Sequence, residues 1–199
     1  MGDTPQPACP GCGKAGLRIT TEESAIPHFG EVVISTLICS QCGFRSTDVL
    51  PVEERTPARF RATISREEDL LIRVIRSSTS TIMIPELGVT IQPGSAHEGY
   101  ISNVEGVLQR VLGILEQVKR DLKERSQELT DARERLKKAE DLSRRIERAT
   151  NGNISEDGHF TIIIEDPQGN SALVDDNGKV QNEELTEEEI LSLMTSLYR

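Results

Sequence analysis

Two short cysteine motifs decide how the first part of this chain folds: residues 9–13 read CPGCG, and residues 39–43 read CSQCG. Exactly 26 residues separate Cys12 from Cys39. A Cys-x-x-Cys turn presents two sulfur atoms to one ion, and two such turns supply the four thiolates of a tetrahedral zinc site. We therefore expect one zinc ion per chain, bound by Cys9, Cys12, Cys39 and Cys42.

A zinc ion with four protein ligands has no open coordination position, so it would stabilise the fold rather than catalyse a reaction. The alternatives are two disulfide bonds or four unrelated thiols. These four cysteines are the only ones in the chain, and the first residues lack the apolar core of a secretory signal. No run approaches the ~20 apolar residues of a membrane span. We therefore expect a reducing, cytoplasmic location, where disulfides are rare.

The residues between the two motifs predict the body of a zinc ribbon. Residues 31–38 (EVVISTLI) are rich in β-branched side chains, which favour a strand leading into the second motif. Residues 17–21 are the expected partner strand, and residues 25–30 (AIPHFG) are the expected loop between the two. His28 is expected on the surface of this loop, because the four cysteines already complete a tetrahedron.

Five segments, in order along the chain, resemble a known family. They are residues 26–34 (IPHFGEVVI), 39–44 (CSQCGF), 84–87 (IPEL), 104–106 (VEG) and 166–171 (DPQGNS). Together they resemble the ZPR-type zinc-finger family, whose eukaryotic members carry two zinc-finger modules and bind translation elongation factor 1-alpha. With a single module, the chain is similar to the shorter archaeal members. The resemblance implies a double-stranded β-helix with an inserted helical hairpin, and elongation factor 1-alpha or its archaeal counterpart as the partner.

Short strands punctuated by turns are expected after the ribbon, which favours a sandwich or a barrel. The expected strands are residues 59–64, 70–76, 81–84, 88–91, 160–164 and 172–174. Asn177 and Gly178 predict a hairpin between the last of these and residues 180–181. Acidic residues at 53, 54 and 67–69 lie among arginines 55, 59, 61, 66, 73 and 76, which indicates a paired, solvated strand edge rather than a nucleic-acid face.

Residues 103–150 contain no proline, and leucines recur every seven residues from Leu108 to Leu136. This a/d seam predicts either one long coiled-coil helix that dimerises or two arms of a hairpin. A continuous helix would span roughly 70 Å, whereas the strands that follow must return to the same domain. We therefore expect arms at residues 103–125 and 131–149, with Ser126 and Thr130 as caps at the bend. The arms either zip to each other or offer a seam to a partner.

The expected fold class is mainly β with α. The expected boundaries are residues 1–50 for the ribbon, 51–102 for the first part of the β domain, 103–157 for the hairpin, and 158–199 for the second part and a C-terminal helix. Thr186 and Glu189 form a capping box that starts this last helix, which should run to about residue 198.

The sequence has no phosphate-cradling glycine loop, no paired nucleophile and base, and no open-site metal motif, so no enzymatic activity is expected; His97 and His159 are isolated. The net charge is -10, and residues 151–199 hold eleven acidic and two basic residues. This balance repels phosphate backbones, so a protein partner is favoured over a nucleic-acid-binding accessory role. A thiol redox protein is a further alternative, which would need one motif free of metal.

We therefore expect a monomeric, non-enzymatic zinc protein that binds elongation factor 1-alpha, or its archaeal counterpart, as a partner or as a factor for its folding. Its candidate contact residues lie in the ribbon: His28, Phe29, Phe44 and Arg45. Phe29 is expected to be exposed on its turn as an apolar anchor. Phe44, beside the second cysteine motif, either joins it or packs under the ribbon.

Overall fold

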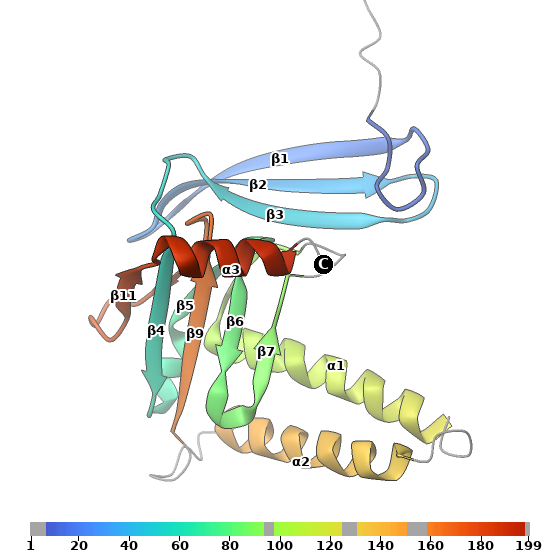
Figure 1. Ribbon diagram of the computed structural model, residues 1–199, viewed down its shortest axis with the longest axis vertical. Helices are drawn as coiled ribbons and strands as arrows, with labels where there is room; N and C mark the ends of the chain where they lie inside the picture. The colour runs from blue at the N-terminus through green and yellow to red at the C-terminus, as the bar shows by residue number, and fades with distance from the viewer. Residues whose placement is uncertain (1–6, 94–97, 125–130, 151–158, 198–199) are drawn as a thin grey trace, which may run out of the picture.

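A computed structural model describes residues 7–93, 98–124, 131–150 and 159–197, and in these ranges it shows three β-sheets and three α-helices. One sheet forms an N-terminal ribbon that lies across the top of a two-sheet β domain, from which a pair of helices projects (Figure 1). The predicted class is confirmed: a four-cysteine ribbon is followed by a β domain of two sheets with an inserted helical hairpin.

The ribbon is an antiparallel sheet of β1 (Leu17–Ile26), β2 (Gly30–Cys39) and β3 (Arg45–Pro51), in that order. The two predicted strands are confirmed, and β1 extends five residues further than expected because it pairs with β2 along its whole length. β3 was not predicted. Its sequence, RSTDVLP, has few apolar residues, and it is held by pairing with β2 rather than by its own strand propensity.

The β domain consists of a five-stranded sheet, in the order β11-β4-β9-β6-β7, and a three-stranded sheet, in the order β10-β5-β8. The strands are β4 (Ala58–Ile64), β5 (Arg73–Arg76), β6 (Thr81–Ile84), β7 (Val89–Ile91), β8 (Tyr100–Asn103), β9 (Phe160–Asp166), β10 (Ala172–Val174) and β11 (Gln181–Glu184). Short 3-10 helices cover Glu67–Leu71 and Pro85–Leu87.

Two strand predictions in this domain are wrong. Residues 70–72 are not part of β5: the Asp69 carboxylate accepts hydrogen bonds from the backbone of Ser65 (2.9 Å) and Arg66 (3.1 Å), which closes a 3-10 turn there. The turn at residues 177–178 does not close a hairpin either. β10 pairs with β5 and β11 with β4, so this turn carries the chain from one sheet to the other.

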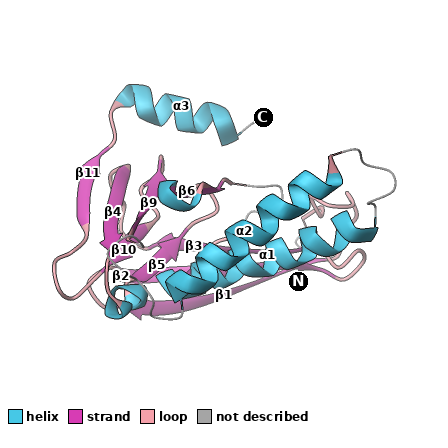
Figure 2. Ribbon diagram, turned by 90° about the horizontal axis from the view of Figure 1, so that it is seen from below, coloured by secondary structure: helices cyan, strands magenta, loops and turns pink. Residues whose placement is uncertain are grey.

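The two long helices, α1 (Val104–Glu124) and α2 (Ala132–Thr150), lie side by side as an antiparallel pair (Figures 1 and 2). The hairpin prediction is therefore confirmed over the single long helix. Ser126 and Thr130, expected as caps at the bend, lie outside the described residues. Among the helices that the structure describes, none has a stretch sufficiently long and apolar to cross a membrane.

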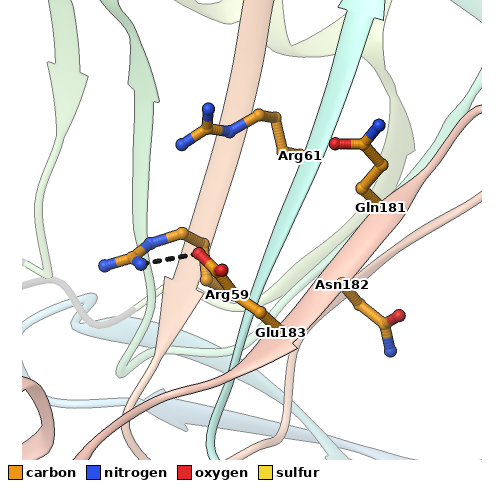
Figure 3. A pocket seen from close by; sticks show the side chains of 5 residues that line it. All are labelled: Arg59, Arg61, Gln181, Asn182 and Glu183. Atoms are coloured by element: carbon orange, nitrogen blue, oxygen red, sulfur yellow. Dashed lines mark hydrogen bonds and ion pairs between the residues drawn. The ribbon is translucent and has the colours of Figure 1, made fainter.

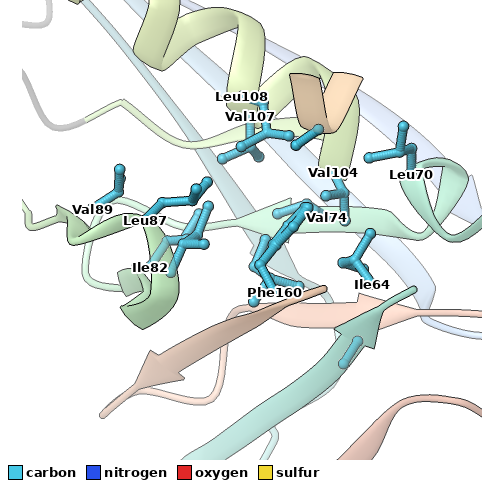
Figure 4. Close-up of a cluster of buried hydrophobic side chains, with 14 of the residues drawn as sticks. Ile64, Leu70, Val74, Ile82, Leu87, Val89, Val104, Val107, Leu108 and Phe160 are labelled. Atoms are coloured by element: carbon cyan, nitrogen blue, oxygen red, sulfur yellow. The ribbon is translucent and has the colours of Figure 1, made fainter. Parts of the chain in front are cut away.

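The base of the hairpin is part of the main hydrophobic core (Figure 4). Val104, Val107 and Leu108 of α1 and Ile146 of α2 are fully buried against β-sheet side chains such as Phe160. Fully burying a side chain of this kind contributes about 1.5–3 kcal/mol, so the base of the hairpin is firmly anchored. Further out, Ile114 is 59% exposed.

The C-terminal helix α3 (Glu187–Leu197) begins at the predicted capping box: Glu189 N–H donates to Thr186 Oγ1 (3.3 Å), and Thr186 N–H donates to Glu189 Oε2 (2.9 Å). Arg59 of β4 attaches the helix to the sheet. Its guanidinium donates to Glu165 of β9 (2.5 Å), Glu183 of β11 (2.7 Å; Figure 3) and Glu189 (2.8 Å). Arg59 is thus paired, as predicted. The predicted strand edge is wrong, because β4 lies between β11 and β9, and Arg76 is buried in the central strand β5 with no ion pair among the described residues.

Candidate metal centre

The four cysteine sulfurs converge at one end of the ribbon, and all lie within 4.8 Å of one another. The Sγ atoms of Cys9 and Cys42 are 3.7 Å apart, and those of Cys12 and Cys39 are 3.9 Å apart. A zinc ion bonded to sulfur at ~2.3 Å in a tetrahedron places its ligands about 3.8 Å apart. The observed cluster therefore has the dimensions of a four-thiolate zinc site.

The same distances exclude disulfide bonds between these cysteines, because bonded sulfurs lie about 2.05 Å apart. All four cysteines are free thiols in the structure. The donor set is soft and complete, which suits zinc in a structural site and leaves no coordination position for water or a substrate.

The two cysteine turns have the same local geometry. Gly13 and Gly43 follow the second cysteine of each turn with φ of 71° and 74°, a left-handed conformation that glycine adopts without steric cost. Each turn aims a backbone N–H at its first sulfur: Gly11 N–H donates to Cys9 Sγ (3.3 Å) and Gln41 N–H donates to Cys39 Sγ (3.4 Å). These amides stabilise negative charge on the ligand sulfurs.

Hydrogen bonding prepares one of the ligands for metal binding. The N–H of Gln41 lowers the pKa of the Cys39 thiol from 9.0 to about 7, although burial opposes the shift. The thiolate is the form that binds zinc, so this hydrogen bond favours the ligand form of Cys39. In the loaded site, the ion would be held by all four sulfurs and would tie the two cysteine turns together.

Phe44 is half-buried and packs against the hydrophobic cluster formed by Cys9, Leu17 and Cys39. Its ring lies close to Gly11, where an added Cβ would come within 3.2 Å of the ring. Phe44 therefore supports the first cysteine turn, and only part of it is accessible.

The ribbon separates the predicted contact residues into two pairs. Phe44 and Arg45 lie at the metal end, whereas His28 and Phe29 lie in the turn at the other end of the β1–β2 hairpin. Nine residue steps of strand separate the two ends, which is about 30 Å. The four side chains do not form one surface.

The expected exposure of Phe29 is wrong. Its side chain is only 3% exposed and packs with Ile26, Val32 and Ile75, and the Arg55 guanidinium lies 4.1 Å from the ring centroid. Phe29 therefore fastens the ribbon to the β domain and is not available as an anchor for a partner. The loop AIPHFG is itself largely apolar, but the β-domain side chains that cover Phe29, such as Ile75, lie far away in the sequence.

The predicted surface position of His28 is confirmed, and its Nε2 lies 3.1 Å from Asp176 Oδ1 in an exposed pair. Of the two other histidines, His159 is exposed and His97 lies outside the described residues.

Sequence reasoning missed a groove beside Arg45, between the ribbon and the start of the hairpin. Its volume is about 390 Å³, and its walls come from residues 34–49 and 98–110. No local motif marks it, because it exists only where these two distant segments meet.

Comparison with known proteins identifies the family. The ZPR1 zinc-finger domain model matches residues 5–56, and the ZPR1 jelly-roll domain model matches residues 68–192. An uncharacterised ZPR1-like protein of Methanocaldococcus jannaschii is 44% identical over 186 residues, which is 93% of this chain and 87% of the relative. A second one, from Pyrococcus horikoshii, is 41% identical over 191 residues, 96% of this chain and 81% of the relative.

A eukaryotic relative matches over a shorter stretch. The zinc finger chaperone zpr1 of Schizosaccharomyces pombe is 39% identical over 72 residues, which is 35% of this chain and 16% of that protein. Two domain models in the right order, a cysteine cluster of the right dimensions and relatives matched over most of their length agree with one another. The chain therefore belongs to the ZPR1 zinc-finger family.

Proposed function

We propose that this protein is a cytoplasmic, monomeric, non-enzymatic factor that binds translation elongation factor 1-alpha, or its archaeal counterpart, and assists its folding. Its resemblance to elongation-factor-binding proteins motivates the partner, and the name of the fission-yeast relative, a zinc finger chaperone, motivates the folding role. The structural observation that carries the proposal is the closed four-sulfur cluster at the end of the ribbon, which suits a rigid binding module better than a catalytic centre.

Rigidity matters because a surface that is already ordered loses little conformational entropy when it binds. The metal end of the ribbon points to the same side of the molecule as the Glu124 end of α1 (Figures 1 and 2). A partner on that side can contact both projections. Arg45 is exposed there, so we place the contact at the metal end and not at the His28 turn.

A nucleic-acid-binding role is the competing proposal, since zinc ribbons can bind either proteins or nucleic acids. The net charge of -10 favours a protein partner, because an acidic chain repels phosphate backbones.

Isothermal titration of the zinc-loaded chain with purified elongation factor 1-alpha, in its GDP and GTP states, tests the proposal. We expect saturable binding that Arg45→Glu weakens roughly tenfold, the effect of losing one charge-assisted hydrogen bond and introducing a like charge. His28→Ala, at the opposite end of the ribbon, is the matched control and should leave the affinity unchanged. Absence of binding in both nucleotide states would exclude this partner, and salt-sensitive RNA binding would favour the competing role.

A further inference from the structure

The groove between the ribbon and the base of the hairpin combines apolar walls with unpaired positive charge. Its lining includes Ile34, Arg45, Val49, Tyr100, Ile101 and Arg110, and its volume is about 390 Å³. The ribbon supplies one wall, and β8 and the first turns of α1 supply the other. A hydrogen bond from Gly99 N–H to Thr47 O (2.5 Å) joins the two walls at their base.

Two guanidinium groups lie near the aromatic ring of this groove. The Arg110 guanidinium lies 4.2 Å from the Tyr100 ring centroid, and that of Arg76 lies 5.5 Å from it. Arg76 is only 5% exposed, and within the described ranges its guanidinium donates to the backbone carbonyl oxygens of Glu98 (2.8 Å), Gln92 (3.2 Å) and Ser80 (3.4 Å).

The positive charge around the groove is not neutralised by ion pairs. Among the residues that the structure describes, no carboxylate forms an ion pair with Arg45, Arg76 or Arg110. Glu98 is the acidic side chain in the described lining, and it is exposed and contacts none of the three as an ion pair. Carbonyl oxygens accept the hydrogen bonds of the buried Arg76 guanidinium, and the carboxylates of Glu98 and Asp48 act on its charge only through space, without an ion pair. The groove is therefore a positively charged site on a chain whose net charge is -10.

We propose that this groove binds an acidic side chain of a partner protein, with the Asp or Glu carboxylate held between Arg45 and Arg110. Tyr100 forms the floor, and an apolar residue next to the acid packs against Ile34 and Ile101. Guanidinium groups suit a carboxylate because they offer paired donors in a plane. The apolar walls and the acidic remainder of the chain favour a peptide over a polyanion such as RNA. This inference rests on the proposed role as a protein-binding module, but not on the identity of the partner.

Selection of short random peptides displayed on phage, against the full zinc-loaded chain, tests the groove without elongation factor. We expect enriched peptides with Asp or Glu beside an apolar residue. Fluorescence anisotropy with the enriched peptides as labelled probes should show at least about tenfold weaker binding to Arg45→Glu and to Arg110→Glu, as expected for the loss of a charge-assisted hydrogen bond. The affinity should also fall with added salt.

Arg61→Glu is the matched control, because Arg61 is an exposed strand arginine in a separate pocket beside Gln181 (Figure 3). It should leave peptide affinity unchanged. Unaltered zinc content and melting temperature of the variants would show that they fold. The proposal would be overturned if the enriched peptides lacked acidic residues. It would also be overturned if acidic peptides bound the double variant Arg45→Glu, Arg110→Glu as tightly as wild type. Selective RNA binding lost in the same variants would also overturn it. If the chain binds acidic peptides in the groove but does not bind elongation factor 1-alpha, the groove proposal stands and only the named partner is excluded.

Discussion

Asp166, at the end of β9, is a buried carboxylate whose removal should strongly destabilise the β domain. Its carboxylate is 1% exposed and accepts hydrogen bonds from Ser171 Oγ (2.6 Å), Ser77 Oγ (2.7 Å), Thr79 Oγ1 (2.8 Å) and Gln168 N–H (2.9 Å). The two serine hydroxyls are themselves buried, so water cannot easily replace the lost acceptor. The network links β9 to the loop before β6 and to the segment that leads into β10.

Each hydrogen bond to a charged group contributes about 1.5–3 kcal/mol, but bonds in one network are not additive. Ser171 can still donate to Ser77, which lies 3.1 Å away and offers partial compensation. We therefore expect Asp166→Ala to lower the free energy of unfolding by about 3–5 kcal/mol, the range for breaking a buried charged network. In a chain of this length, the melting temperature should fall by about 6–20 °C.

Urea and thermal unfolding of zinc-loaded protein, followed by circular dichroism, measure this loss. Asp176→Ala is the matched control: its carboxylate is exposed and contacts His28 on the surface, so the change should stay within about 0.5 kcal/mol. If Asp166→Ala lowers the free energy of unfolding by less than about 1 kcal/mol, the Asp166 hydrogen-bond network does not contribute to stability as proposed.

Three further predictions concern the ribbon, the hairpin and acid stability. Phe29→Ala should lower the free energy of unfolding by about 3–5 kcal/mol, since the ring is buried; urea unfolding would show this, and an unchanged midpoint would contradict it. Spin labels at Gln109 and Arg144 should lie close together within one chain, whereas a separation of about 50 Å would indicate a continuous helix. Burial alone would raise the pKa of Asp69, but hydrogen bonds, led by that from Lys179, lower it to about 2. Because the pKa is lowered on folding, ionised Asp69 stabilises the fold at pH values above its unfolded pKa of about 3.9, and this stabilisation is lost as the pH falls through about 2. Asp69→Asn should therefore be less stable than wild type at neutral pH, and the difference should nearly vanish at about pH 2.

The sequence was most informative where local chemistry alone fixes the structure. The cysteine spacing specified the metal cluster, the seven-residue leucine repeat specified the helical hairpin, and Thr186 with Glu189 specified the start of α3. In each case the pattern and the structure it makes lie within one short segment or one repeated motif.

Features that depend on distant partners were missed. β3 has few apolar residues and forms by pairing with β2, and the four-residue β8, which directly precedes the hairpin and was not expected as a strand, forms by pairing with β5. Phe29 is buried by contacts with Arg55 and the β domain, and the groove beside Arg45 has walls from two separate segments. The pairing of β11 with β4, rather than with β10, likewise depends on the whole sheet.

The DPQGNS motif at residues 166–171 also acquires its physical meaning only from the structure. Gly169 has φ of 73°, and a Cβ there would lie 2.6 Å from the carbonyl oxygens of Arg55 and Thr56. The motif therefore combines the acceptor Asp166 and the donor Ser171 with a glycine that allows close backbone packing. Its function is structural: it joins the end of β9 to the segment that follows the ribbon.

The central claim is a closed, structural zinc centre made by Cys9, Cys12, Cys39 and Cys42. X-ray absorption at the zinc edge, on freshly purified protein with its metal content quantified, tests the claim most directly. We predict one zinc per chain with four sulfur ligands at about 2.3 Å and no lighter ligand. Absence of stoichiometric zinc, or a nitrogen or oxygen atom in place of one sulfur, would contradict a closed site and reopen the redox or catalytic alternatives.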